Sequence, residues 1–116
     1  MKEVRVRFSV IIPLYNKEAY IEQTLGSVLA QTYPFFEVII VDDGSSDASL
    51  QIVNGITDSR IRVISQVNSG VATARNRGVK EAKENYVAFM DADDFWAPNY
   101  LERIAFLIST CPDAGI

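Results

Sequence analysis

The sequence predicts an α/β protein built on a mainly parallel β-sheet. Four short runs of apolar, often β-branched residues alternate along the chain with four segments of helical periodicity, and this βαβαβαβα order is typical of parallel sheets. The runs are apolar on both faces, as strands are when helices cover both sides of a sheet. With 116 residues, 48% of them hydrophobic, the chain has the size and core content of one domain.

The expected strands are Phe8–Leu14, Phe36–Val41, Ile61–Ser65 and Tyr86–Met90. Right-handed crossovers allow the strand order 3-2-1-4, in which the winding reverses between strands 1 and 4. Ligands of open α/β sheets bind outside the carboxyl ends of the strands at such a reversal. We therefore expect a three-layer sandwich whose binding site lies at the ends of strands 1, 2 and 4.

The first two expected helices follow the first two strands. Lys17–Gln31 carries an apolar stripe at positions i, i+4, i+7 and i+8, formed by Ile21, Leu25, Val28 and Leu29. Asp47–Ile56 begins after Ser45 and Ser46, and serine and aspartate are favoured residues for capping a helix N-terminus. Both helices are expected to pack on the sheet.

The third and fourth expected helices differ in their packing faces. Ser69–Glu84 has a face of mostly small residues, suited to close packing on a sheet: Val71, Ala74, Gly78, Val79 and Ala82. Pro98–Thr110 opens with proline near the first helical position, where its missing N–H costs nothing. The segment Cys111–Ile116 then predicts a turn that leads into a fifth strand. We therefore expect the chain to be a fragment of a longer protein.

Composition excludes several classes of function. A net charge of −4 and a pI near 4.7 argue against a nucleic-acid surface, which needs a basic stripe. The absence of histidine removes Ser-His and zinc-His chemistry. The single cysteine, Cys111, excludes an internal disulfide, fits a reducing compartment and is expected to be a small half-buried hydrophobic residue. No apolar run approaches the ~20 residues that cross a bilayer. We expect a cytoplasmic location.

Two clusters of aspartates follow strands 2 and 4. The first is Asp42-Asp43-Gly44-Ser45-Ser46-Asp47, and the second is Asp91-Ala92-Asp93-Asp94. Neighbouring carboxylates repel one another unless cations or hydrogen bonds offset the repulsion. Oxygen-rich sites suit hard divalent ions such as Mg²⁺ and Mn²⁺. Together with Pro13-Leu14-Tyr15-Asn16 after strand 1, the clusters predict a site that holds a metal and a phosphorylated ligand.

Three of these segments have a second interpretation that the pattern leaves open. Residues 43–47 are also of the types that are favoured in a turn followed by a helix cap. Tyr15 is either a core aromatic or a ring that stacks on a base. Asn68-Ser69-Gly70 either caps the third helix or presents N–H groups to a phosphate, because helix N-termini attract anions.

Four further side chains are equally ambiguous. Arg75 and Arg77 lie about two turns into the third helix, and each is either a solvated charge or a ligand contact. Phe95 and Trp96 either cover the core or line a sugar pocket. Pattern alone does not decide between these readings.

The motifs taken together resemble those of the family 2 glycosyltransferases, which have the GT-A fold, a Rossmann-like three-layer sandwich. The resemblance runs from Phe8 to the last residue, with all blocks in order: Ser9-Val10-Ile11-Ile12-Pro13-Leu14-Tyr15-Asn16, Gln31-Thr32-Tyr33, Glu37-Val38-Ile39-Ile40-Val41-Asp42-Asp43-Gly44-Ser45-Ser46-Asp47, Asn68-Ser69-Gly70, Ala74-Arg75-Asn76-Arg77-Gly78 and Asp91-Ala92-Asp93-Asp94. The resemblance implies that residues 1–116 are the N-terminal, nucleotide-sugar-binding part of a glycosyltransferase domain.

The resemblance also implies roles for particular residues. The nucleotide-sugar site would be formed by Pro13, Tyr15, Asp43, Arg75 and Asp91. Asp93, with Asp94 as an alternative ligand in the same acidic run, would coordinate Mn²⁺ or Mg²⁺ on the diphosphate. Asp91 and Asp93 would be the two acids of the family's Asp-x-Asp motif.

The implied reaction is sugar transfer, with inversion, from a nucleoside-diphosphate sugar to an acceptor hydroxyl. The donor would be a UDP-sugar and the acceptor a glycan or a lipid-linked molecule, in polysaccharide or cell-surface glycan synthesis. The general base is expected beyond Ile116, so we expect residues 1–116 alone to be inactive. We also expect a homodimer through the surface that truncation exposes, and a whole protein that is cytoplasmic or peripheral at the inner face of the membrane.

Two other classes compete with this interpretation. A response-regulator receiver domain has a similar length and an acidic Mg²⁺ pocket, but it needs an acidic pair after strand 1 and an aspartate after strand 3, where this chain has Asn16 and Gln66. A non-catalytic nucleotide- or carbohydrate-binding module would not need Asp91 and Asp93. A metal titration separates that alternative from a glycosyltransferase.

Overall fold

A computed structural model describes residues 5–110 and confirms the predicted fold class. The four strands form one all-parallel sheet in the order β3-β2-β1-β4, as predicted. The strands are β1 (Phe8–Leu14), β2 (Phe36–Asp43), β3 (Ile61–Gln66) and β4 (Tyr86–Phe89), and the helices are α1 (Ile21–Leu29), α2 (Ser49–Asn54), α3 (Val71–Glu81) and α4 (Tyr100–Thr110). Cys111 and the predicted turn into a fifth strand lie outside the described residues.

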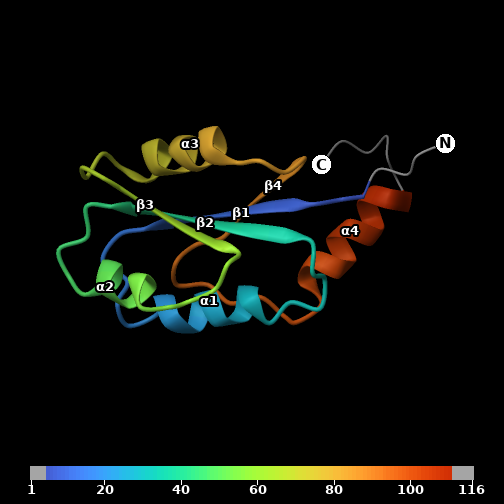
Figure 1. Ribbon diagram of the computed structural model, residues 1–116, viewed down its shortest axis with the longest axis horizontal. Coiled ribbons are helices and arrows are strands. Elements are labelled where there is room, and N and C mark those ends of the chain that lie inside the picture. The colour runs from blue at the N-terminus through green and yellow to red at the C-terminus, as the bar shows by residue number, and fades with distance from the viewer. Residues whose placement is uncertain (1–4, 111–116) are drawn as a thin grey trace.

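The helices cover the two faces of the sheet unequally (Figure 1). Side chains of α1, α2 and α4 pack on one face, where the larger core cluster includes the fully buried Val10, Ile12 and Leu14 of β1. The other face is covered by α3, which lies over β1 and β2 and buries Ile39, Val41 and Ala74. The three layers are therefore present, with most of the core on the α1 side.

The strand ends differ slightly from the predicted boundaries, and the difference affects the site. β2 continues through Asp42 and Asp43, which pair with Ser65 and Gln66 of β3. The first two aspartates are thus the last residues of a buried strand, and both are less than 5% exposed. They lie in the sheet because the β3 ladder satisfies their backbone groups, and only the segment from Gly44 onward is a turn.

The prediction that every strand is covered on both faces is wrong for β4. This strand lies at the edge of the sheet, and Val87 and Phe89 are 39% and 49% exposed. The cause is the position of α3, which packs over β1 and β2 and leaves the same face of β4 open. On α4, Phe106 and Leu107 are also exposed. Within the described range, no helix combines the length and apolar character needed to span a membrane.

Helix α3 packs closely on the sheet because of one glycine. A Cβ atom on Gly78 would overlap the Cγ2 methyl of Ile11, which is fully buried in the central strand. Isoleucine is stiff at χ1, so its methyl group has no free direction in which to turn. In the small-residue face predicted for this helix, Gly78 is therefore the position where a larger residue would collide with the sheet.

We predict that Gly78→Ala destabilises the protein by about 1–3 kcal/mol, the usual cost of forcing an extra methyl into a packed core. Gly26→Ala is the matched control, because Gly26 lies in α1 with open space around its Cα and alanine is the better helix former. Urea denaturation should show opposite signs for the two variants. Equal effects would contradict the packing described for α3.

Candidate functional site

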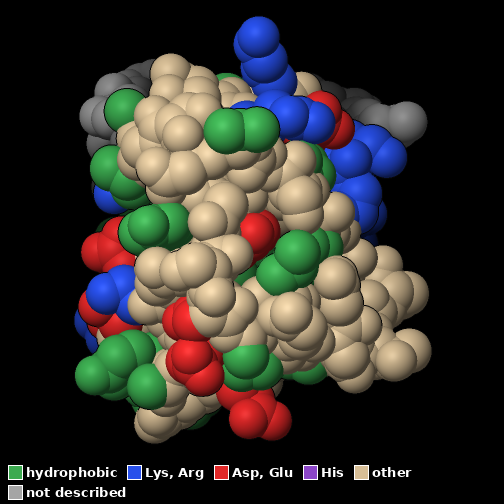
Figure 2. All heavy atoms as spheres, turned by 90° about the vertical axis from the view of Figure 1, so that its left-hand side faces the viewer, with side chains coloured by type: hydrophobic (Ala, Val, Ile, Leu, Met, Phe, Trp, Pro, Cys, Tyr) green, Lys and Arg blue, Asp and Glu red, His purple; other side chains and the backbone are tan. Residues whose placement is uncertain are grey.

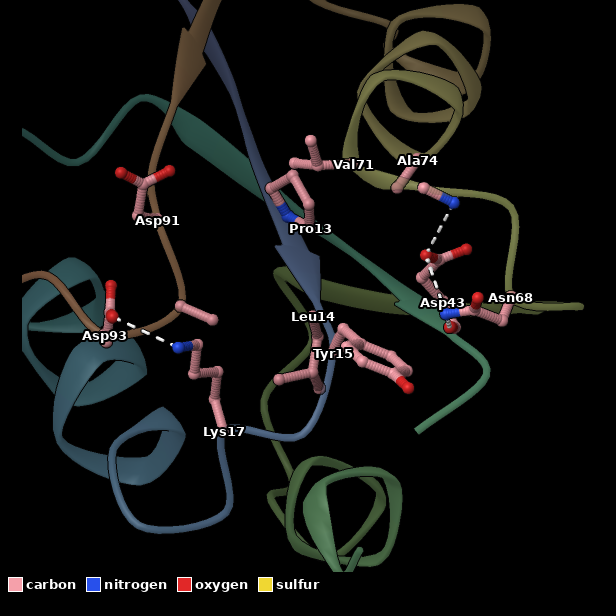
Figure 3. A pocket seen from close by; sticks show the side chains of 12 residues that line it. Pro13, Leu14, Tyr15, Lys17, Asp43, Asn68, Val71, Ala74, Asp91 and Asp93 are labelled. Atoms are coloured by element: carbon pink, nitrogen blue, oxygen red, sulfur yellow. Dashed lines mark hydrogen bonds and ion pairs between the residues drawn. The ribbon is translucent and has the colours of Figure 1, made fainter. Parts of the chain in front are cut away.

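The carboxyl ends of β1, β2 and β4, with the loop after β3, surround a cavity of about 570 Å³. This volume is within the range of small-molecule sites, which measure about 300–1,000 Å³. It lies at the predicted reversal of winding between β1 and β4 (Figure 3). The lining residues are Pro13, Leu14, Tyr15, Lys17, Asp43, Asn68, Gly70, Val71, Ala74, Asp91, Ala92 and Asp93.

Viewed toward the ends of the strands, this face of the molecule shows separate acidic groups with hydrophobic side chains between them (Figure 2). In the cavity itself, Asp91 and Asp93 lie on one side and Asp43 with Asn68 on the opposite side, while Pro13 lies between them (Figure 3). The two clusters of aspartates that the sequence singled out therefore contribute opposite walls of one site.

Asn16 joins the end of β1 to the turn after β2. Its backbone is in the left-handed region, with φ of 50°, a conformation that asparagine tolerates better than most residues. Its Oδ1 atom accepts hydrogen bonds from the backbone N–H groups of Ser46 (2.8 Å) and Asp47 (3.2 Å), and its own N–H donates to Ser45 Oγ (3.0 Å). Asn16 thereby holds the segment after β1 against the turn after β2.

The Asp43 carboxylate joins the end of β2 to the loop that precedes α3. Its Oδ1 atom accepts from Gln66 Nε2 and from the Ser69 N–H, both at 2.8 Å. Its Oδ2 atom accepts from the Gly70 N–H (3.0 Å) and from Asn68 Nδ2 (3.3 Å). Four donors thus surround one carboxylate that is 3% exposed.

This arrangement bears on the two interpretations of Asn68-Ser69-Gly70, which were a cap for the third helix and a set of N–H groups that face a phosphate. The N-cap residue of α3 is Gly70, and no side chain caps that helix. The N–H groups of Ser69 and Gly70 do face an anionic group, but that group is the protein's own Asp43. The loop that precedes α3 is therefore held by a carboxylate at the end of β2.

The turn after Asp43 needs glycine for two reasons. Gly44 has φ of 73°, which is strained for residues with a side chain. A Cβ atom there would also lie 2.7 Å from the backbone nitrogen of Asn68. The Asp-Gly sequence is therefore required for the close approach between the turn and the loop after β3.

Hydrogen bonding holds Asp43 in its charged form. Burial alone would raise its pKa, but the hydrogen bonds from Gln66, Ser69 and Gly70 stabilise the carboxylate and bring the pKa below its ordinary value. At neutral pH Asp43 therefore carries a negative charge on the wall of the cavity.

A buried polar stripe on α1 fixes the acidic loop after β4. The hydroxyl of Thr24 lies 2.9 Å from the Ala92 carbonyl oxygen and 2.7 Å from that of Asp94, and donates to both as a shared hydrogen bond. Ser27 Oγ accepts from the Trp96 N–H (3.2 Å). The loop that carries the acids is thus attached to a helix by its backbone.

Gln31, just beyond the end of α1, holds the far end of the loop. Its Nε2 donates to the Ala97 carbonyl (2.6 Å) and its Oε1 accepts from the Leu101 N–H (2.9 Å). Thr24, Ser27 and Gln31 are all buried. Thr24 and Ser27 lie on α1, and Gln31 lies just beyond the end of that helix. Sequence reasoning assigned none of them a role, although three polar residues at helical spacing beside an apolar stripe are a usable signal.

The acids of the β4 loop are exposed and form ion pairs. Arg75 Nη2 lies 3.5 Å from Asp91 Oδ1, and Lys17 Nζ lies 3.3 Å from Asp93 Oδ2. Asp94 points elsewhere, and its Oδ1 accepts from the Phe95 N–H. Two carboxylates therefore face the cavity, each beside a cation from another element.

Most of the predicted nucleotide-sugar residues are brought together. Pro13, Tyr15, Asp43 and Asp91 line the cavity, and Arg75 lies beside it through its contact with Asp91. Tyr15 is 47% exposed, which removes the alternative of a core aromatic. Of the predicted metal ligands, Asp93 lines the cavity, and Asp94 is not among the lining residues.

The remaining ambiguous side chains take structural or solvent-exposed positions. Trp96 belongs to the core and stacks on Tyr100, with ring centroids 4.6 Å apart. Phe95 is exposed, and neither aromatic lines the cavity. Arg77 pairs with Glu81 one turn along its own helix.

The donor set fits a divalent cation that shares its coordination with a ligand. Within residues 5–110, no three acidic or cysteine side chains gather closely enough to hold a metal alone. Asp91 and Asp93 offer carboxylate oxygens on one wall of the cavity. Mg²⁺ is commonly bound by one or two carboxylates together with substrate phosphates. The two acids match that pattern and do not match a self-sufficient metal cage.

The fold and this cavity define an α/β protein of the GT-A type with a candidate ligand site at the carboxyl edge of its sheet. The model of the family described as "Glycosyl transferase family 2" matches residues 9–115, and the chain belongs to that family. An uncharacterized glycosyltransferase of Haemophilus influenzae is 44% identical over 98 residues, which cover 82% of this chain and 39% of that protein. TuaG of Bacillus subtilis, provisionally named a teichuronic acid biosynthesis glycosyltransferase, is 47% identical with the same coverage.

Solved structures agree with the family assignment. Residues 1–349 of Staphylococcus aureus TarS in complex with UDP-GlcNAc superpose with a TM-score of 0.85 at 38% identity, covering 90% of this chain and 32% of that one. The mannosyltransferase PcManGT of Pyrobaculum calidifontis, in complex with GDP-Man and Mn²⁺, superposes with a TM-score of 0.82 at 28% identity, covering 97% and 34%. The chain thus spans about a third of the length of these proteins.

We predict that Thr24→Val destabilises the protein by about 1–3 kcal/mol, because valine keeps the shape of threonine but leaves the buried loop carbonyls without their donor. Thr73→Val is the matched control, since Thr73 is exposed on α3. Guanidinium denaturation measures both. A cost no greater than that of the control would contradict the attachment of the acidic loop to α1.

We predict that the stabilising effect of Asp43 depends on pH. Because its pKa is lower in the folded state, Asp43 contributes stability above the unfolded pKa of about 3.9, and this contribution is lost as pH falls through the folded value. Denaturation at a series of pH values from neutral into acid should therefore show that the destabilisation caused by Asp43→Asn is largest at neutral pH and shrinks as the pH falls below about 3.9. Glu22→Gln, on the exposed face of α1, should follow the parent throughout. A difference for Asp43→Asn that does not change with pH would contradict this assignment.

Proposed function

We propose that the protein binds the nucleoside-diphosphate-sugar donor of a metal-dependent, inverting glycosyltransferase. The observation that carries the proposal is the cavity with Asp91 and Asp93 on one wall and Asp43 beside Tyr15 on the other. A donor has a base at one end and an anionic diphosphate at the other, so it needs two unlike sites within one cavity. The TarS and PcManGT complexes with UDP-GlcNAc and GDP-Man support a nucleotide sugar as the ligand.

We propose that the base lies between Tyr15 and Asp43. The exposed ring of Tyr15 offers a stacking surface, and Pro13 forms the adjoining part of the wall. The Asp43 carboxylate accepts the N–H of the base, as uracil provides. Its longest hydrogen bond, 3.3 Å from Asn68 Nδ2, is the contact that most easily gives way to the base.

We propose that Asp93, with Asp91 or Asp94, holds Mn²⁺ or Mg²⁺ on the donor diphosphate, and that Arg75 contacts the same end of the donor. When bound, such a cation withdraws negative charge from the departing nucleoside diphosphate. The chain's own contribution is to orient the diphosphate: Thr24 fixes the acidic loop, and Asn16 and Asp43 fix the opposite wall. PcManGT in its complex with Mn²⁺ supports a divalent cation.

The activity of the whole protein is a further proposal, since this chain covers 39% of the Haemophilus influenzae relative and 32% of the TarS chain. We propose that the general base and the acceptor site lie in the part of the relatives that this chain does not cover. The donor is proposed to be a UDP-sugar, and the acceptor a glycan or lipid-linked hydroxyl in polysaccharide synthesis. TuaG supports that pathway class.

The proposal also includes a cellular location and self-association. A cytoplasmic location, with or without peripheral attachment to the inner face of the membrane, provides access to nucleotide sugars. Self-association is proposed through the exposed apolar side chains of β4 and α4, because such patches on isolated domains tend to find a partner. These side chains are Val87, Phe89, Phe106 and Leu107.

We predict that UDP binds with an affinity that rises when Mn²⁺ is added, and that Asp93→Asn removes most of the rise. Isothermal titration calorimetry with and without Mn²⁺ measures this, and Glu22→Gln provides a control that removes the same charge from an exposed position on α1. Unchanged ion dependence in Asp93→Asn would reject the assignment. UDP binding that ignores Mn²⁺ in the parent protein would favour a non-catalytic nucleotide-binding module.

A further inference from the structure

Lys17 is a cavity residue to which neither the sequence motifs nor the proposed reaction gives a role. Its ammonium nitrogen lies 3.3 Å from Asp93 Oδ2, and both residues line the cavity (Figure 3). The side chains are 40% and 46% exposed. Because an ion pair this exposed contributes little to stability, its geometry needs another explanation.

The backbone of Lys17 is fixed although its side chain is exposed. Its N–H donates to the Oγ atom of Ser49, which is fully buried (2.9 Å). Its carbonyl accepts from the N–H groups of Tyr20 and Ile21, both at 2.9 Å, in the turn that leads into α1. The ammonium group therefore moves on a flexible four-carbon stem whose origin is held in place.

Two of the three carboxylates in the acidic loop, Asp91 and Asp93, form ion pairs. Asp91 faces Arg75 and Asp93 faces Lys17, so each carboxylate has one cationic neighbour from a different element. The Lys17 ammonium repels a divalent cation that approaches Asp93, because the two charges have the same sign. A diphosphate attracts the same ammonium, because its negative charge exceeds that of one carboxylate.

We propose that Lys17 is a positioning residue that neutralises Asp93 until the donor arrives and then moves to the donor's phosphate oxygens. The carboxylate of Asp93 is thereby released to the divalent cation. Lys17 thus couples cation binding to donor binding. It weakens the binding of a divalent cation to the acidic loop when no donor is bound. This inference rests on the proposed function, since it requires a phosphorylated ligand in the cavity.

The proposal predicts two effects of opposite sign in Lys17→Met. Without nucleotide, the variant should bind Mn²⁺ more tightly, because Asp93 has lost its internal counterion. Without metal, it should bind UDP more weakly, because the phosphates have lost a cation. Couplings between binding events are typically about 5- to 150-fold, so a change of about fivefold or more is expected in each direction.

Two measurements on the protein test this. Electron paramagnetic resonance of free Mn²⁺ gives the metal affinity in the absence of nucleotide, and calorimetry in the presence of a chelator gives the UDP affinity without metal. Lys80→Met is the matched control: Lys80 is exposed in the last turn of α3, does not line the cavity and carries the same charge. It should change either affinity by less than about twofold. Lys17→Arg keeps the charge and should behave as the parent protein. Lys17→Gln removes the charge and tests the same two effects in case Lys17→Met fails to fold.

A second comparison assigns the effect to Asp93. In an Asp93→Asn background, Lys17→Met should no longer tighten Mn²⁺ binding, because there is no carboxylate to release. Mn²⁺ binding that stays unchanged in Lys17→Met, or that tightens equally in Lys80→Met, would overturn the role of Lys17 while leaving ion-dependent UDP binding intact. A parent protein that binds no UDP under any condition would instead overturn the proposed function, and this inference with it.

Discussion

The hydrogen bonds to the Asp43 carboxylate are the interaction on which the cavity depends. Parallel strands bring their carboxyl ends to one edge, but nothing in a sheet ladder sets how far apart the connecting loops lie beyond that edge. Here one buried carboxylate receives donors from the end of β3 and from residues 68–70, at 2.8 to 3.3 Å. Gly44 permits the approach, since any side chain there would meet Asn68. The wall of the cavity opposite the acidic loop is therefore part of the protein's hydrogen-bonded framework.

The aspartates of the two clusters have different roles because their environments differ. Asp43 is buried and surrounded by N–H donors, which keep it charged and fixed. Asp91 and Asp93 are exposed and, among residues 5–110, pair with the long side chains of Arg75 and Lys17, which can exchange partners. The Asp43 carboxylate holds the loop before α3 in place and forms part of the proposed base site. The carboxylates of Asp91 and Asp93 are available to a cation that also binds the diphosphate. The loop that carries them is itself held by Thr24, so the acids are free to bind while their backbone is not free to move.

The sequence predicted the strands and their order because apolar runs with β-branched residues report burial directly, and right-handed crossovers leave few topologies. It also predicted that Pro13, Asp43 and Asp91 converge, which follows from the order alone. It did not predict the exposure of Val87 and Phe89. The residue pattern of a strand does not reveal whether a helix covers each of its faces. The long-range polar contacts were equally hidden. Thr24 and Ala92 are 68 residues apart, and no local rule links them.

The most direct test of the account is a crystal structure of the protein with UDP and Mn²⁺, with anomalous diffraction measured to locate the manganese. The account predicts one anomalous peak at about 2.0–2.3 Å from a carboxylate oxygen of Asp93 and from phosphate oxygens, with the uracil beside Tyr15 and Asp43. UDP bound outside this cavity, or manganese bound away from the loop 91–94, would contradict it.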